Sequence, residues 1–183
     1  MPVRNSTTRW GSVAQLLHWT IVVLIIVQFV LGYRAHWATG LKKLSTVVPH
    51  KSWGITILML AVIRLVWRLA NPTTPLLPTT LKPWERGAAH VTHYGLYIIL
   101  FAMPLTGWIA SSARSFPVSW FGLVQLPDLV GSNRPLYDSL MTVHYWLSWT
   151  LVAIALLHIA AALKHHFVLK DDVLRRMLPF TKT

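Results

Sequence analysis

Long apolar stretches alternate with short polar segments along this chain, and this pattern sets the expected architecture. Four stretches are long enough to cross the ~30 Å hydrocarbon core of a bilayer as helices. They lie at about residues 13–32, 50–69, 90–110 and 142–163. A proline-rich segment at 71–83 follows the second stretch, and a longer connection at 111–141 precedes the fourth. The pattern predicts an all-α integral membrane protein whose single domain, residues 1–183, is a four-transmembrane-helix bundle.

The composition supports a membrane protein and excludes several kinds of site. The chain is 54% hydrophobic and only 12% charged, which is too apolar for an ordinary soluble domain. The formal charge of +12 therefore indicates contact with anionic lipid headgroups rather than with nucleic acid, and the ten tryptophans favour the same interface. The absence of cysteine excludes disulfides, thiolate-bound iron–sulfur clusters and covalently attached haem. Any haem in this protein must be bound non-covalently.

The distribution of Lys and Arg orients the predicted bundle, because these residues are more frequent in cytoplasmic segments. One side of the membrane would carry both termini and the second connection, with Arg4, Arg9, Arg64, Arg68, Lys82, Arg86, Lys164, Lys170, Arg175, Arg176 and Lys182. The other side has fewer such residues, namely Arg34, Lys42, Lys43, Lys51, Arg114 and Arg134. Both termini are therefore expected to be cytoplasmic.

Four histidines in the apolar stretches form two pairs when they are sorted by depth. His144 and His158 are fourteen residues apart on the fourth stretch, which is two heptads along one helix face and roughly 21 Å of rise. With both termini cytoplasmic, His158 and His18 lie toward the inner surface. His144 and His50 lie toward the outer surface.

These two pairs supply the four imidazole ligands that two bis-histidine haems require. Each haem iron takes one imidazole on each side of the porphyrin, from different helices at equal depth and between apolar walls. A single transmembrane histidine is equally compatible with a packing or proton-relay role, but four that pair by depth favour haem. The pattern therefore predicts two b-type haems with His18 and His158 as one ligand pair and His50 and His144 as the other. Gly54, one turn after His50, is expected to clear space for the porphyrin.

Three further residues near the inner pair are candidates for supporting roles. His165 follows His158 by one heptad and competes with it for the inner iron, although its position among lysines near the inner boundary favours His158. His165 is otherwise either an interfacial residue or part of a quinone or propionate site. His93 is either an interfacial residue or a hydrogen-bond partner of a propionate or a quinone carbonyl. Arg64 is placed to pair with a haem propionate.

Several motifs that contain these residues resemble the bacterial cytochrome b561 family, closest to its four-helix superoxide oxidase members. The resemblance covers essentially the whole chain. Its motifs are LLHW at 16–19, HKSWGITILMLAVIRLVWRLANPT at 50–73, HVTHYGLY at 90–97, VHYWLSWTLVAIALLHIAAALKHHF at 143–167 and LRRMLP at 174–179.

The resemblance implies a function that the spacing alone does not specify. It implies a multi-pass protein of the bacterial inner membrane in which two haem b groups transfer electrons between the outer face and ubiquinone in the bilayer. In superoxide oxidases the donor is superoxide, which is oxidised to dioxygen. Outer-sphere electron transfer needs no general base or nucleophile, so no catalytic side chain is predicted. Basic residues on the outer side either steer the superoxide anion or are ordinary juxtamembrane charges, and these are Lys42, Lys43, Lys51, Arg114 and Arg134.

Two alternatives remain open on the sequence. In the first, the chain is a cytochrome b membrane anchor that exchanges electrons with a dehydrogenase or hydrogenase subunit. In that case the apolar segment FPVSWFGLVQL at 116–126, which is too short to span and is expected to lie along the interface as an amphipathic element, is the candidate docking surface. The other alternative is a histidine-based proton or metal carrier, which would require carboxylates inside the membrane. All five acidic residues lie outside the apolar stretches.

Overall fold

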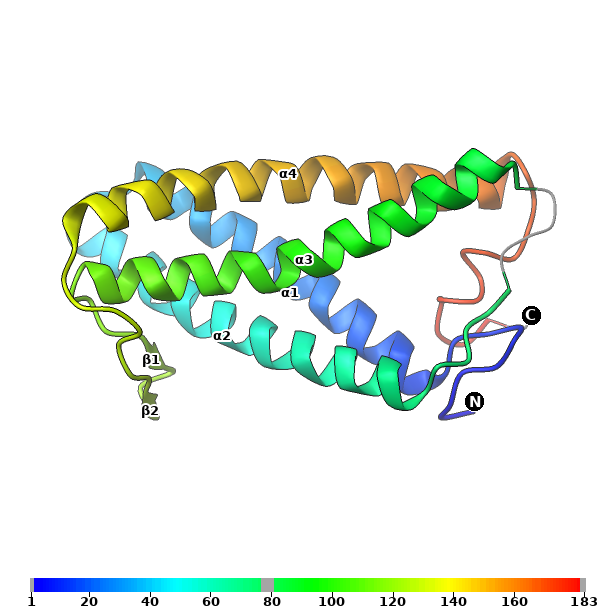
Figure 1. Ribbon diagram of the computed structural model, residues 1–183, viewed down its shortest axis with the longest axis horizontal. Helices are drawn as coiled ribbons and strands as arrows, with labels where there is room; N and C mark the ends of the chain where they lie inside the picture. Colours follow the sequence, from blue (N-terminus) through cyan, green and yellow to red (C-terminus); the bar gives the residue numbers. More distant parts are fainter. Residues whose placement is uncertain (1, 77–80, 182–183) are drawn as a thin grey trace. The chain divides into compact units, whose positions relative to one another are not determined.

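The computed structural model describes residues 2–76 and 81–181, and its main elements are four helices (Figure 1). In chain order the elements are α1 (Ser12–Trp37), α2 (Gly40–Ala70), α3 (Pro83–Ala113), β1 (Ser119–Trp120), β2 (Val124–Gln125) and α4 (Arg134–Phe167). Part of the proline-rich connection predicted at 71–83, residues 77–80, lies outside the described residues. Lys182, one of the basic residues used to orient the bundle, also lies outside them.

All four helices are long and apolar enough to cross a membrane, which confirms the predicted four-span, all-α fold. The helices are longer than the apolar stretches. For example, α2 begins at Gly40 rather than near residue 50, and α4 begins at Arg134 rather than near residue 142. The difference arises because backbone hydrogen bonding continues past the hydrocarbon boundary, where polar side chains such as Lys42 and Asp138 are exposed.

The chain folds as two compact units, and each contains segments of all four helices. The first unit comprises Met1–Thr20, Val62–Tyr97 and Leu151–Thr183, and we call it the terminal unit. The second comprises Ile21–Ala61 and Ile98–Thr150 and includes both strands, so we call it the hairpin unit. The predicted histidine pairs divide between these units, because His18 and His158 belong to the terminal unit and His50 and His144 to the hairpin unit.

Hydrogen bonds within the terminal unit join the N-terminal and C-terminal segments. The side chain of Gln15 is only 2% exposed, and its Nε2 donates to the carbonyl oxygens of Trp10 and Arg176, at 3.1 Å each. The indole Nε1 of Trp19 donates to the carbonyl oxygen of Met177 at 2.9 Å. These bonds satisfy polar groups at the start of α1 with the backbone of the C-terminal segment, so the two chain ends close one end of this unit.

In the hairpin unit, the segment expected to be a small amphipathic element is a two-stranded antiparallel hairpin. Ser119 of β1 pairs with Gln125 of β2. The Oγ of the buried Ser52 on α2 donates to the carbonyl oxygen of Ser119 at 3.0 Å and accepts from the backbone N of Phe121 at 3.1 Å. The turn contains Phe121 at φ 49° and Gly122 at φ 74°, and such positive values end any helical run. The hairpin is thereby anchored to α2.

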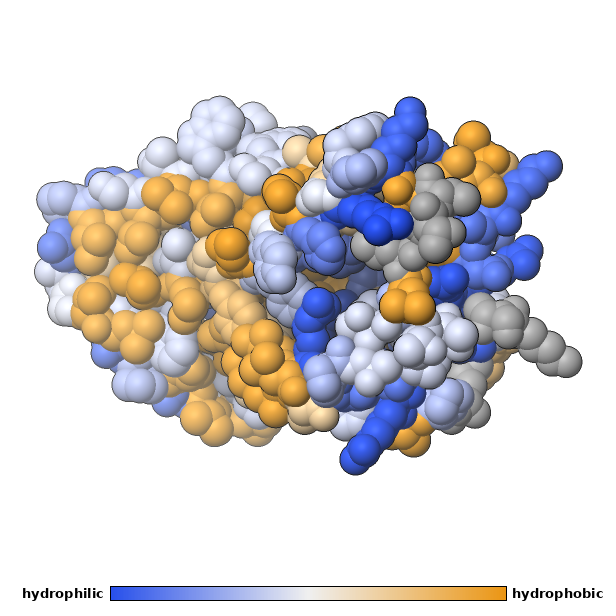
Figure 2. All heavy atoms as spheres, turned by 45° about the vertical axis from the view of Figure 1, so that its right-hand side comes forward, coloured by the Kyte–Doolittle hydropathy of each residue, from blue (hydrophilic) through white to orange (hydrophobic). Residues whose placement is uncertain are grey.

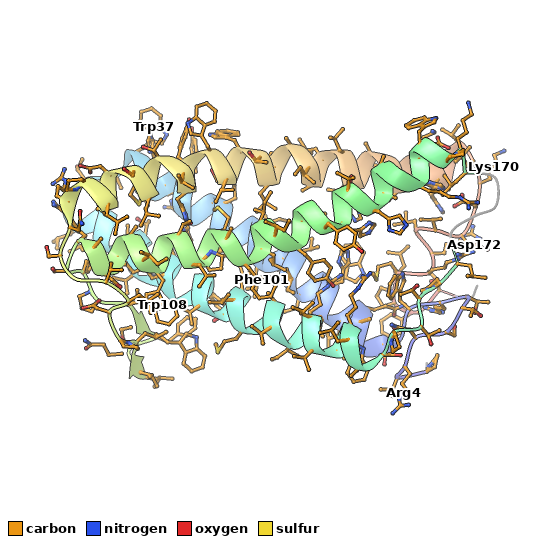
Figure 3. The ribbon with its side chains drawn as sticks, viewed as in Figure 1. Arg4, Trp37, Phe101, Trp108, Lys170 and Asp172 are labelled. Atoms are coloured by element: carbon orange, nitrogen blue, oxygen red, sulfur yellow. The ribbon has the colours of Figure 1, made fainter. Side chains whose placement is uncertain are left out.

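Apolar side chains on the outer faces of the helices are exposed, as expected for a protein surrounded by lipid (Figure 2). On α4 no described residue is buried, and Leu156 and Leu157 are 60% and 67% exposed. Trp37, at the end of α1, is 71% exposed (Figure 3). Indole rings favour the boundary between lipid and water, so this position suits a helix end at the membrane interface.

Candidate functional site

His50 of α2 and His144 of α4 face each other within the hairpin unit. Their ring centroids are 6.2 Å apart and their planes are inclined by 73°. Each ring also lies against a glycine of another helix. A Cβ atom added to Gly32 of α1 would lie 3.3 Å from Cε1 of His50, and one added to Gly107 of α3 would lie 3.3 Å from Cε1 of His144. Both glycines therefore allow an imidazole ring to approach a neighbouring backbone closely.

The terminal unit contains a second pair with nearly the same geometry. The ring centroids of His18 on α1 and His158 on α4 are 6.4 Å apart, with planes inclined by 72°. The structure thus brings together the same two pairs that depth along the sequence predicts.

The two separations fit the axial ligands of a haem iron. A metal–imidazole bond is about 2 Å long. A five-membered ring with bonds of ~1.33 Å has its centroid about 1.1 Å from each ring atom. Two imidazoles on opposite sides of one iron therefore place their centroids about 6.2 Å apart, which agrees with 6.2 and 6.4 Å. Two imidazoles per site suit an iron whose other ligands come from a porphyrin. Among the described residues, no group of three or more His, Asp or Glu side chains is placed to hold a bare metal ion.

A threonine that the sequence analysis missed determines which nitrogen of His144 is free to bind iron. The hydroxyl of Thr106 donates to the carbonyl oxygen of Met103 at 2.8 Å, so its oxygen is an acceptor toward Nδ1 of His144 at 3.1 Å. Nδ1 of His144 must then carry the proton, and Nε2 presents its lone pair. A hydrogen bond on the second nitrogen that fixes the tautomer is the usual environment of a metal-binding histidine.

His93 lies next to the histidine pair of the terminal unit. Its ring centroid is 5.2 Å from that of His158, with planes inclined by 85°. Its Nδ1 is 2.6 Å from the carbonyl oxygen of Ala89, which can only accept, so Nδ1 carries the proton. Nε2 of His93 is left with a lone pair beside the site.

Arg64 approaches the same histidines from α2. Its Nε donates to the phenolic oxygen of Tyr97 at 3.2 Å. Its charge lies close enough to act electrostatically on His18, His93 and His158. The structure therefore places a cation at this pair, as the sequence predicts, and adds Tyr97 as its partner. Tyr97 follows His93 by one helical turn on α3, so the two residues share a helix face, and it is the last residue of the HVTHYGLY motif at 90–97.

His165 is engaged with a carboxylate rather than with the histidine pair. Its Nδ1 is 2.5 Å from Oδ2 of Asp171, and the two side chains are 13% and 20% exposed. The other carboxylate oxygen of Asp171 accepts from the backbone N of Val173 at 3.0 Å. Within the described ranges no ring contact joins His165 to His18. The sequence analysis did not predict this role of Asp171, because the contact depends on the turn that follows α4.

Gly54 lies against a side chain of α1. A Cβ atom at Gly54 would lie 3.1 Å from the side-chain nitrogen of Gln28, so this glycine makes room for an amide of α1. The glycines in contact with the imidazole rings are Gly32 and Gly107. The expected role of Gly54, to clear space for the porphyrin, stays a prediction.

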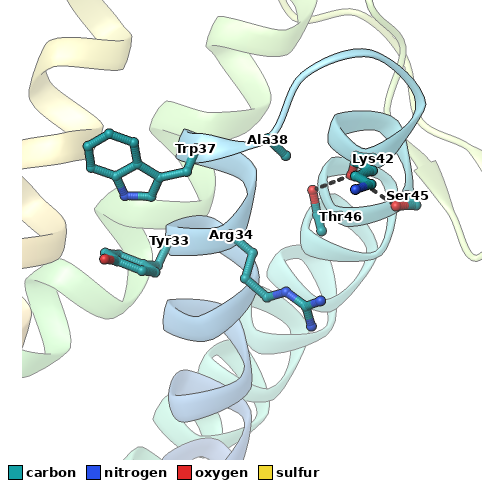
Figure 4. A pocket seen from close by; sticks show the side chains of 7 residues that line it. All are labelled: Tyr33, Arg34, Trp37, Ala38, Lys42, Ser45 and Thr46. Atoms are coloured by element: carbon teal, nitrogen blue, oxygen red, sulfur yellow. Dashed lines mark hydrogen bonds between the residues drawn. The ribbon is translucent and has the colours of Figure 1, made fainter.

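A cavity of about 620 Å³ lies between the end of α1 and the start of α2 in the hairpin unit (Figure 4). It is lined by Tyr33, Arg34, Trp37, Ala38, Lys42, Ser45 and Thr46. The hydroxyls of Ser45 and Thr46 donate to the carbonyl oxygen of Lys42 at 2.9 and 3.1 Å, so they offer only lone pairs to the cavity. Neither Arg34 nor Lys42 has an ion pair with any residue that the structure describes. These two side chains give the cavity a positive charge.

Of the residues that the sequence analysis considers for steering, which include Lys42 but not Arg34, two are held by neighbouring groups. The ammonium of Lys51 is 3.3 Å from the ring centroid of Phe116 and donates to the carbonyl oxygen of that residue at 2.9 Å. Arg134 forms an ion pair with Asp138 at 3.0 Å. Their charges are less available to an anion than those of Arg34 and Lys42.

Comparison with known proteins shows similarity over nearly the whole chain. The sequence model of one family, prokaryotic cytochrome b561, matches residues 9–180. Cytochrome b561 homolog 2 of Escherichia coli (strain K12) is 35% identical over 185 residues, which cover 97% of this chain and 95% of that protein. A protein of Yersinia pestis named "Probable superoxide oxidase CybB" is 33% identical over 163 residues, covering 89% and 92%. Cytochrome b561 homolog 1 of E. coli is 28% identical over 182 residues, covering 95% and 99%.

Proposed function

The chain belongs to the prokaryotic cytochrome b561 family, and from this membership we propose that it is a superoxide:ubiquinone oxidoreductase. The family comprises haem b proteins that transfer electrons in bacterial membranes. The proposal adds that residues 1–183 work as one domain of the inner membrane, with both termini cytoplasmic and two haems. It is supported by the two opposed imidazole pairs, with separations of 6.2 and 6.4 Å, and by the Yersinia relative that is named a superoxide oxidase.

In this proposal the four paired histidines would bind the haem irons. His50 and His144 would hold one haem, and His18 and His158 would hold the other. His158 is preferred to His165 because Nδ1 of His165 is committed to Asp171, whereas the ring of His158 already faces His18. When bound, the haems supply one-electron carriers, and the protein contributes their placement and surroundings.

Charge in the hairpin unit supports superoxide as the donor. With both termini cytoplasmic, the order of residues along α1 and α2 puts Arg34 and Lys42 on the periplasmic side. Their cavity attracts a small anion to the unit that contains His50 and His144. Each superoxide that becomes dioxygen releases one electron, so two are consumed for every ubiquinone reduced.

Residues of the terminal unit would supply the protons that ubiquinone reduction requires. Reduction to ubiquinol takes two electrons and two protons. His93 holds its Nδ1 proton against Ala89, so it can take a second proton on Nε2 and deliver it to a quinone oxygen. His165 is a second candidate for this role, with its Nδ1 held by the carboxylate of Asp171. Arg64, close to the histidine pair, would bind a haem propionate.

The activity is tested by rapid mixing of the purified two-haem protein with superoxide and a water-soluble ubiquinone analogue. We expect ubiquinol to form with one quinol for every two superoxide ions consumed above spontaneous dismutation. Full haem content without superoxide-dependent quinol would refute the proposed donor and favour the membrane-anchor function.

The ligand assignment is tested separately by the haem content of single variants. His50→Ala and His18→Ala should each lose one of the two haems, seen as a halved absorbance of the reduced b-type haem per protein. His36→Ala is the matched control, since its ring lies 6.2 Å from that of Tyr145 and belongs to neither pair. If both alanine variants keep the full haem content, the pairing is wrong.

A further inference from the structure

Gln28 is an amide in the apolar interior of α1, and it contacts the α2 backbone at His50. Its Nε2 donates to the carbonyl oxygen of His50 at 2.9 Å. It also precedes Gly32 by one helical turn, and Gly32 is the residue whose backbone lies against the His50 ring. An amide inside a membrane-spanning helix is costly unless it is hydrogen-bonded, so its presence here requires a structural or functional reason.

Two buried side-chain atoms of the hairpin unit make no hydrogen bond of full geometry among the described residues, and they are chemically complementary. They are Oε1 of Gln28 and Nδ1 of His50, although the backbone carbonyl oxygen of Gln28 also lies close to the His50 ring. The amide oxygen can only accept. If Nε2 of His50 provides the lone pair to iron, Nδ1 must carry the proton and can only donate. Both atoms belong to residues that are already joined through the amide nitrogen and the His50 carbonyl.

His144, the other ring of this pair, shows how a hydrogen-bond acceptor can hold the Nδ1 atom of a paired histidine. Nδ1 of His144 has an acceptor on a neighbouring helix, the hydroxyl of Thr106 at 3.1 Å. Each ring also has a backbone carbonyl oxygen close to it, that of Met103 for His144 and that of Gln28 for His50, but among the described residues His50 has no side-chain acceptor like Thr106. Gln28 has a free acceptor and a bond to the same residue.

We propose that Gln28 is a positioning residue for His50. Its amide nitrogen holds the α2 backbone at His50, and its amide oxygen accepts from Nδ1–H when the haem is bound. The inference rests on the proposed assignment of His50 as an iron ligand. Accepting this hydrogen bond makes the imidazole a stronger donor to iron, which favours ferric over ferrous haem and slows ligand loss.

Gly54 offers an independent way to test the same contact. A Cβ atom at this position would lie 3.1 Å from Nε2 of Gln28, closer than ordinary van der Waals contact. Gly54→Ala should therefore push the amide away from His50 by a few tenths of an ångström without changing either residue. Gly54→Ala should therefore change haem loss and the midpoint potential in the same direction as removal of the Gln28 amide, but by a smaller amount.

The experiment compares Gln28→Leu and Gly54→Ala with Ile26→Ala, a control on the exposed side of the same helix. Haem loss to apomyoglobin and the midpoint potentials of both haems are measured on purified, haem-loaded protein. We expect Gln28→Leu to release the His50/His144 haem roughly 10- to 100-fold faster and to raise its midpoint potential. The haem of the terminal unit should be unchanged, and so should both haems in Ile26→Ala.

The outcomes separate this inference from the ligand assignment. Unchanged haem loss and unchanged potentials in Gln28→Leu, with one haem missing from His50→Ala, overturn the role of Gln28 alone. If His50→Ala retains two haems, both the assignment of His50 as an iron ligand and the role of Gln28 are refuted. If Gln28→Leu does not accumulate in the membrane, Gly54→Ala decides, since it should raise the same midpoint potential and an unchanged value refutes the proposal.

Discussion

Replacement of Thr106 by valine tests whether the hydroxyl orients His144 for iron. Valine has nearly the volume of threonine but no hydroxyl, so Nδ1–H of His144 loses its 3.1 Å partner and keeps only the carbonyl oxygen of Met103. Loss of one such hydrogen bond costs about 0.5–1.5 kcal/mol. Converted at about 1.4 kcal/mol per tenfold change, this predicts roughly 2- to 12-fold weaker haem retention at the His50/His144 pair. The His18/His158 pair lies in the other compact unit and should retain its haem.

The assay is transfer of haem from purified protein to excess apomyoglobin, followed by the visible spectrum. The wild type should release its two haems at similar slow rates, whereas Thr106→Val should show one fast phase of half the amplitude. Thr106→Ser is the matched control, because it keeps the hydroxyl and should behave as the wild type. A fast phase of the same size in the serine variant, or equal rates in all three proteins, would show that the hydroxyl has no role in holding the ligand.

Three further predictions concern the stability of the folded protein, the approach of superoxide and the midpoint potential of the His18/His158 haem. Ser52→Ala removes the side chain that satisfies two backbone groups of the hairpin, so the free energy of unfolding in detergent should fall by about 1–3 kcal/mol, and unchanged denaturation would show that the anchor is dispensable. Arg34→Glu combined with Lys42→Glu should lower the superoxide-dependent rate about tenfold at low salt and much less at high salt; a loss that is equal at both salt concentrations would argue against steering. Arg64→Gln should lower the midpoint potential of the His18/His158 haem, because a nearby positive charge stabilises the reduced form, and a redox titration with an unaltered or raised potential contradicts this.

The two histidine pairs are alike in separation but differ in their surroundings. The pair of the hairpin unit has neutral partners, Thr106 and Gln28. The pair of the terminal unit has a cation, Arg64, and a third imidazole, His93, at 5.2 Å from His158. Positive charge raises a reduction potential, so under the proposed two-haem function this asymmetry would favour electron movement from the first pair toward the second. It agrees with the proposed direction from periplasmic superoxide to ubiquinone.

The sequence alone predicts the parts of this protein that depend on one helix at a time. The apolar stretches determine the four spans, because each must shield its own backbone from lipid and be about 20 residues long. The fourteen-residue interval places His144 and His158 on one face, since the helical repeat is a local property of the chain. Depth then identifies His50 as the partner of His144 and His18 as the partner of His158, because helices that cross one bilayer share a common coordinate along its normal.

Only the tertiary structure decided what surrounds those rings. Gly32, Gly107, Thr106 and Gln28 contact His50 or His144 from other helices, and nothing in their own sequence neighbourhoods marks them. Asp171 reaches His165 through a turn in which Lys170 has a φ of 54°, a conformation that hydrophobic periodicity does not specify. Hydrogen-bond partners depend on the rotation and spacing of packed helices to within about an ångström, whereas a periodic pattern specifies only which face of a helix is apolar. For that reason the sequence predicts the pairs, and the fold selects the groups that orient them.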